Sequence, residues 1–150
     1  MTHAMTPLPG PNALKRPASL QNLPAGVETI LLVDDEDGVR RPVRRVLERQ
    51  GYVVLEAQSG DQALDLLRAG GADIALVVCD LAMPGMTGLD LIKRIGAGAR
   101  PRILLMSGYP DESIRAFGGI PAGVGFLSKP FTLGALITEV RALLDSSTLV

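Results

Sequence analysis

Short apolar runs alternate with segments of helical periodicity from residue 28 to residue 145. Each run is continuously apolar, without the in-and-out alternation of a half-exposed strand. Continuous apolar character is typical of strands that are covered on both faces. The predicted strands are residues 30–33, 53–55, 74–78, 103–106 and 124–127.

Between these runs, apolar residues recur every three or four positions, which is the spacing of helices that pack on a sheet. The stripes predict helices around residues 39–47, 63–67, 89–95 and 133–144, and Ser59 is expected to cap the second. A further helix is expected over residues 112–117 with Asp111 as its cap, and Pro42 is expected to kink or shift the first. Five strands alternating with five helices predict an α/β domain with a parallel sheet and right-handed crossovers.

The first 26 residues differ from the rest. They hold five prolines and no acidic residue, and no continuous apolar stretch follows their Lys-Arg pair. Such a segment buries too little apolar surface to offset its ordering entropy, and it does not resemble a signal peptide. We therefore expect a disordered leader or linker over residues 1–26, one domain over residues 27–146 and a short tail over residues 147–150.

Composition narrows the classes of function. The chain has 150 residues with 47% hydrophobic and 21% charged residues, typical of one globular domain. A net charge of −1 offers no basic surface for nucleic acid. Apolar runs of about five residues are far shorter than the roughly 20 that a membrane helix needs. Cys79 is the single cysteine, which suits the cytoplasm, and it is expected in the core.

Polar side chains follow four of the five predicted strands. Residues 34–37 are all acidic, Asp80 follows the third strand, Ser107 the fourth and Lys129 the fifth. Ligands of open α/β sheets bind beyond the carboxyl ends of the strands. We therefore expect these side chains to share one edge of the sheet.

This set of residues suits phosphoryl chemistry. Neighbouring carboxylates repel one another unless a cation binds, and Mg²⁺ prefers a few carboxylate oxygens. Lys129 and the hydroxyl of Ser107 can stabilise the charge on a phosphoryl group in transfer. Asp80 would then be the nucleophile that forms an acyl phosphate.

Four motifs in order carry a family resemblance: ILLVDDED, VVCDLAMPGMTGLDL, ILLMSGYPDE and GFLSKPF. Over about residues 28–145 the chain resembles the receiver domain of two-component response regulators. The resemblance implies a doubly wound, flavodoxin-like sheet in the order 2-1-3-4-5, with Asp80 as phosphoacceptor. It implies Mg²⁺ ligation by Asp35, Asp80 and the carbonyl of Ala82, with Asp34 acting mainly through water. It also implies a cis bond between Lys129 and Pro130.

The same resemblance implies a signalling role and not that of an enzyme. The donor would be a sensor histidine kinase or a histidine phosphotransfer protein. Ser107 and Phe126 would form the switch, although the family often has tyrosine at the second position. A homodimer would use the fourth helix, the fifth strand and the fifth helix. The chain would be either a free-standing regulator or the C-terminal receiver of a hybrid sensor kinase.

Other classes of function remain as alternatives to this one. Residues 35–39 superficially match the nucleophile motif of haloacid dehalogenase phosphatases, but that class leaves Asp80 without a role and needs an acidic pair on a strand after Lys129. A receiver-like binding module that is never phosphorylated is a second alternative. A nucleotide-binding Rossmann domain lacks its glycine-rich turn, and a histidine phosphotransfer protein lacks a histidine on a helix, because His3 lies in the leader.

Overall fold

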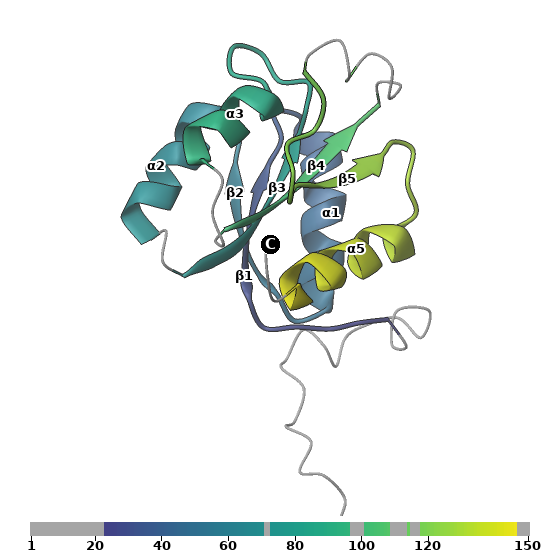
Figure 1. Cartoon of the computed structure of the whole chain (residues 1–150). Helices are drawn as coiled ribbons and strands as arrows, with labels where there is room; N and C mark the ends of the chain where they lie inside the picture. The colour runs from purple at the N-terminus through teal and green to yellow at the C-terminus, as the bar shows by residue number, and fades with distance from the viewer. Residues whose placement is uncertain (1–22, 71–72, 97–100, 109–113, 115–117, 147–150) are drawn as a thin grey trace, which may run out of the picture.

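The computed structural model describes residues 23–70, 73–96, 101–108, 114 and 118–146. Its strands form one parallel sheet in the order β2-β1-β3-β4-β5, as the resemblance implied. The strands are β1 (Thr29–Val33), β2 (Val53–Ala57), β3 (Ile74–Asp80), β4 (Arg102–Ser107) and β5 (Gly125–Ser128). Helices α1 (Asp37–Arg49) and α5 (Leu133–Asp145) cover one face, and α2 (Gly60–Gly70) and α3 (Gly88–Ile95) cover the other (Figure 1).

Burial of the strands explains why their sequences are continuously apolar. In β1, Leu31 and Val33 belong to the core under α2 and α3, whereas Ile30 and Leu32 belong to the core under α1 and α5. Every residue of β3 is buried. Successive strand residues therefore enter opposite cores, which confirms the prediction of a sheet covered on both faces.

Local hydrogen bonds fix where the helices begin. The Ser59 hydroxyl accepts the backbone N–H of Gln62 at 3.1 Å, which confirms the predicted cap of α2. A capping box between Thr87 and Asp90 starts α3, and the Thr132 hydroxyl caps α5. Pro42 lies inside α1, which continues through it from Asp37 to Arg49, and the expected kink or shift stays a prediction.

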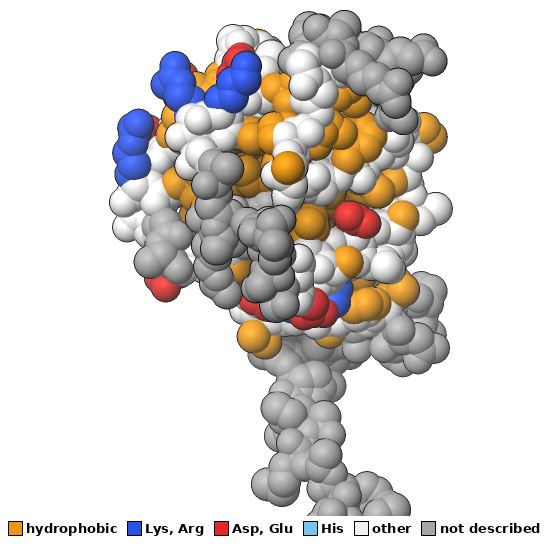
Figure 2. Space-filling view, viewed as in Figure 1, with side chains coloured by type: hydrophobic (Ala, Val, Ile, Leu, Met, Phe, Trp, Pro, Cys, Tyr) orange, Lys and Arg blue, Asp and Glu red, His pale blue; other side chains and the backbone are white. Residues whose placement is uncertain are grey.

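Four helices are described where five were expected. The predicted helix over residues 112–117 and its cap Asp111 lie outside the described residues, apart from Ile114, which is helical and buried. Hydrophobic side chains gather on the face where β4 and β5 lie (Figure 2). Among the apolar residues that pack against the core there, Ile120, Val124 and Phe126 are only partly buried.

A segment that precedes the sheet is bound to the C-terminal end of α1. We call residues 23–26 the N-terminal strap. The side-chain amide of Gln50 donates to the carbonyls of Leu23 and Pro24 at 3.3 and 2.7 Å, and the N–H of Gly26 donates to the Gln50 carbonyl at 3.0 Å. Gln50 is fully buried. The strap therefore runs along the amino-terminal edge of the sheet, beneath α5 and α1 (Figure 1).

Side chains attach this strap to α5 as well. Leu23 packs against Val46 of α1 and the fully buried Ile137 of α5. Arg141 of α5 forms an ion pair with Glu28, which follows the strap, at 2.6 Å. The expected leader–domain boundary at residues 26 and 27 stays a prediction. None of the helices that the structure describes is long and apolar enough to cross a membrane.

Candidate functional site

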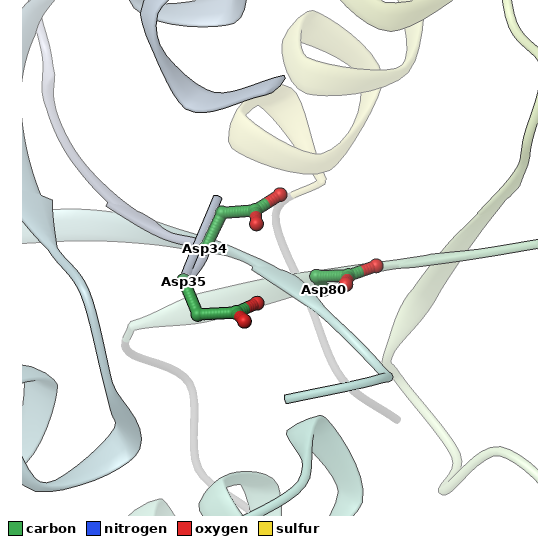
Figure 3. A group of neighbouring side chains, drawn as sticks. All are labelled: Asp34, Asp35 and Asp80. Carbon is green, nitrogen blue, oxygen red and sulfur yellow. The ribbon is translucent and has the colours of Figure 1, made fainter. Parts of the chain in front are cut away.

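Three acidic side chains meet at the carboxyl edge of the sheet. Asp34 and Asp35 follow β1, and Asp80 is the last residue of β3. Their carboxylates point to the same side (Figure 3). One oxygen from each lies within 4.8 Å of the others, which is close enough for one cation to contact all three. The neighbouring strands β1 and β3 therefore bring together a compact cluster of acidic side chains, which we call the acidic pocket.

Lys129 brings a positive charge to this pocket from the end of β5. Its ammonium group lies 2.9 Å from Oδ1 of Asp80, whose side chain is 7% exposed. Its backbone N–H donates to the Ser107 carbonyl at 2.7 Å, which ties the end of β5 to the end of β4. The Lys129–Pro130 peptide is cis, as the resemblance implied. The lysine thus reaches the aspartate from two strands away in the sheet.

The acidic pocket also contains buried oxygens that have no protein partner. Oδ1 of Asp34 accepts the N–H of Glu36 at 3.0 Å. Among the described residues, Oδ2 of Asp34 and Oδ1 of Asp35 are buried and have no hydrogen-bond partner. Leaving charged oxygens unsatisfied in this way is costly, and a hard divalent cation with oxygen ligands would remove the cost. The pocket therefore fits Mg²⁺.

The electrostatics of Asp34 agree with this interpretation. Burial raises the pKa of its carboxyl group, and the negative charge of Asp80 raises the pKa further, against the opposing hydrogen bond from Glu36. A bound cation would favour the ionised form and reverse that direction. The protein therefore keeps a carboxylate where its charge is disfavoured, which is a feature of functional sites.

The other predicted site residues lie at or near the same edge. Ser107 is the last residue of β4 and is buried, and Ala82 is exposed in the loop after β3. Phe126 lies in β5 beside Leu105 of β4 and packs, partly buried, against the core under α2 and α3. The metal-ligand role of Ala82 and the switch roles of Ser107 and Phe126 stay predictions.

Gly88, which no sequence pattern singled out, packs against the backbone around Asp80. A Cβ added at Gly88 would lie 2.6 Å from the Asp80 carbonyl oxygen and 2.9 Å from Cα of Leu81. The N–H of Gly88 donates to the Leu81 carbonyl at 2.9 Å. Only glycine lets the start of α3 approach the strand end so closely. The available signal was a glycine directly after the capping residue Thr87.

Arg40 was also missed. Its side chain is buried in α1, and it donates to the carbonyl of Asp34 at 2.7 Å. In the sequence it stands in the run RRPVRR, which looks like an exposed polar face. The one local signal was Asp37, three residues earlier, with which it forms an ion pair.

The fold and this edge define a doubly wound α/β domain that carries an acidic pocket beside a lysine. The family model of the response regulator receiver domain matches residues 30–141. The chain therefore belongs to the response regulator receiver domain family, which is a family of signalling domains in two-component systems. Phosphorylation and Mg²⁺ binding at an acidic pocket are general properties of this family.

Curated relatives carry this domain as one part of longer proteins. The chain is 38% identical over 123 residues to the sensor kinase CckA of Brucella abortus, covering 81% of this chain and 13% of the kinase. It is 37% identical over 120 residues to the response regulator MprA of Mycolicibacterium vanbaalenii, covering 79% of this chain and 51% of the regulator. The chain thus spans about half or less of the length of these relatives.

Solved receiver structures show the same architecture. The receiver domain of the hybrid histidine kinase CckA is 34% identical with a TM-score of 0.64, and the match covers 78% of this chain and 99% of that domain. The receiver domain of an HD domain-containing protein from Pseudomonas fluorescens Pf-5 is 27% identical with a TM-score of 0.70, and the match covers 80% and 96%. A complete receiver domain therefore corresponds to about four fifths of this chain.

Proposed function

We propose that Asp80 accepts a phosphoryl group from a phosphohistidine on a sensor histidine kinase or a histidine phosphotransfer protein. The observation that carries the proposal is the position of the Asp80 carboxylate, between two other carboxylates and the Lys129 ammonium group. Mg²⁺ would be held by Asp35, Asp80 and the carbonyl of Ala82, and Asp34 would act mainly through bound water.

The reaction needs little from the protein beyond position and charge. A carboxylate oxygen of Asp80 attacks phosphorus while the phosphorus–nitrogen bond of the phosphohistidine breaks and its electron pair returns to the imidazole. Lys129, already in contact with Asp80, donates to an oxygen of the transferred group, and the Ser107 hydroxyl donates to another. When bound, Mg²⁺ supplies positive charge beside the same oxygens.

The output would be a conformational switch and not turnover of a substrate. Ser107 would move toward the phosphorylated aspartate, and Phe126 would turn further into the core against which it already packs. The surface affected would include β5 and α5, which is also the proposed surface of a homodimer. Phenylalanine at this position presents no hydroxyl to a partner. We place this signalling role in the cytoplasm, without direct contact with nucleic acid or membrane.

Labelling by acetyl phosphate in the presence of Mg²⁺ tests the proposal. Mass spectrometry of the intact protein and of its peptides should show one added phosphoryl group on Asp80. Asp80→Asn should abolish labelling because an amide is a poor nucleophile. Glu36→Gln is the matched control, since it removes an exposed acid beside the pocket and should leave labelling intact.

Three results would contradict the proposal, and each points to a different alternative. Strong labelling of Asp80→Asn would move the acceptor elsewhere. No labelling of the wild-type protein would favour a receiver-like binding module that is never phosphorylated. Repeated hydrolysis of a generic phosphate monoester would favour the haloacid dehalogenase alternative.

A further inference from the structure

Arg40 joins three parts of the fold with a single buried guanidinium group. The residue is 4% exposed. Its Nη1 donates to the carbonyl of Asp34 at 2.7 Å, its Nε donates to Glu56 of β2 at 3.0 Å, and its Nη2 donates to Asp37 in the first turn of α1. A buried arginine is costly unless its donors are paired. Here the strand β2, the helix α1 and the loop that carries Asp34 each provide a partner.

The carbonyl contact completes the hydrogen bonds that fix Asp34. Its N–H donates to the Ala57 carbonyl of β2 at 3.1 Å, and its Oδ1 accepts from the N–H of Glu36 at 3.0 Å. With Arg40 on its carbonyl oxygen, Oδ2 is the one polar atom of Asp34 that has no hydrogen-bond partner among the described residues. The Asp34 carboxylate belongs to the acidic pocket, so Arg40 helps to hold the loop that carries it in a fixed orientation.

The charge of Arg40 has a smaller effect on the pocket than its geometry. A bare cation near the pocket would repel Mg²⁺, but two carboxylates, on Glu56 and Asp37, lie within hydrogen-bond distance of this guanidinium. Such pairing cancels much of the long-range field. What remains specific to Arg40 is the bond to the Asp34 carbonyl.

Arg44 provides a matched comparison one turn further along α1. It forms an ion pair with the same Glu56 at 2.6 Å and with Glu48 at 3.2 Å, and its side chain is 43% exposed. Arg40 and Arg44 thus share a helix, a charge and a carboxylate partner. They differ in burial and in the contact with the loop after β1, which of the two only Arg40 makes.

We infer that Arg40 is a positioning residue for the metal pocket and fixes Asp34 and Asp35 through the Asp34 carbonyl. This inference rests on the proposed function, because it concerns the same Mg²⁺ site. It adds a residue that lies outside the ligand set and that acts through a backbone atom. Loss of a partner that orients metal ligands in this indirect way typically costs about 10- to 100-fold in metal affinity.

Calorimetric titration with Mg²⁺ alone tests the inference on the whole chain. Arg40→Ala should raise the dissociation constant for Mg²⁺ on the order of tenfold. Arg40→Lys keeps the charge but not the three-way geometry of the donors, and it should also weaken binding. Arg44→Ala should bind Mg²⁺ close to the wild-type value, although its stability against urea can fall.

Labelling rates provide a second measurement that a purely structural role would not change. The Mg²⁺ concentration for half-maximal labelling by acetyl phosphate should rise in both Arg40 variants, while the rate at saturating Mg²⁺ returns close to that of the wild type. If Arg40→Ala does not fold, Arg40→Lys carries the test, because it still pairs its charge with Glu56.

Two results would overturn the inference. One is wild-type Mg²⁺ affinity in a folded Arg40 variant. The other is an equal loss of affinity in Arg44→Ala, which would assign the effect to the shared partner Glu56. Absence of Mg²⁺ binding by the wild-type protein is a different failure, because it would refute the proposed function itself.

Discussion

Replacing Glu28 with glutamine removes one of the two negative partners of Arg141 at the amino-terminal edge of the sheet. The two groups form an ion pair at 2.6 Å, and their side chains are 27% and 19% exposed. The hydrogen bond from Arg141 lowers the pKa of Glu28 from 4.5 to about 2, against the opposing effect of burial. The substitution should therefore destabilise the fold at neutral pH and much less in acid.

The size of the effect follows from the shift in pKa. A shift from 4.5 to about 2 corresponds to about 3 kcal/mol if nothing screened the pair. Because both side chains contact solvent, screening reduces this to about 1–2 kcal/mol. Asp145 also forms an ion pair with Arg141 at 2.8 Å, so a partner remains in the variant and moderates the loss further.

The sign of the pH dependence is fixed by the direction of the shift. Glu28 is ionised in both states above its unfolded pKa, so its full contribution is present at neutral pH. As pH falls from about 5 to about 2, the unfolded state takes up the proton first and the contribution disappears. The difference in unfolding free energy between wild type and Glu28→Gln should shrink over that window.

Urea unfolding at pH 7, 5, 4 and 3, followed by circular dichroism, measures this difference. Asp65→Asn is the matched acid-to-amide control, because its pair with Arg68 is long at 3.6 Å and highly exposed. It should change stability little at any of these pH values. A Glu28→Gln variant as stable as the wild type at pH 7, or a difference that stays constant down to pH 3, would refute the reasoning.

Two further predictions concern the pocket. Asp34→Asn should raise the unfolding free energy of the metal-free protein by about 1 kcal/mol, because it removes one of three mutually repelling carboxylates. It should also reduce the rise in Tm that Mg²⁺ produces. Thermal unfolding with and without Mg²⁺ measures both effects, and an unchanged rise in Tm with Mg²⁺ would contradict the assignment of Asp34 to the metal site. Gly88→Ala should cost about 1–3 kcal/mol in urea unfolding, because its new Cβ meets the Asp80 carbonyl. The control Gly70→Ala meets no atom within 4 Å and should be neutral or stabilising; equal stability of the two variants would refute the steric argument.

Much of the fold could be predicted from the sequence, because a strand that is buried on both faces is apolar along its whole length. The fully buried β3 appears as an unbroken apolar run that ends at Asp80. Ser59 and the stripe of α5 were equally local signals. The strap could not be predicted in this way, because its contacts join Leu23 to Gln50 and Ile137, residues far apart along the chain. The proline-rich composition distinguished the segment from the rest of the chain but did not indicate which residues it contacts.

The candidate site also contains residues that a local sequence signal identifies and residues that only contacts between elements identify. Asp34, Asp35 and Asp80 were identified because parallel strands bring their carboxyl ends to one edge, so position along the chain determined position in space. Arg40 carries no such signal. Its role depends on Glu56, sixteen positions away, and on a backbone carbonyl, which no side-chain pattern encodes. A periodic pattern within one element can be identified from the sequence. A hydrogen bond between two elements leaves no such pattern, so it is identified only from the three-dimensional structure.

The strap also separates one end of the domain from the candidate site. It is bound to Gln50, next to the start of β2, at the end of the strands opposite to Asp80 (Figure 1). Leu23 therefore lies at the pole of the domain opposite to the carboxylates. A phosphohistidine donor that approaches Asp80 should therefore meet the carboxyl edge of the sheet without touching the strap.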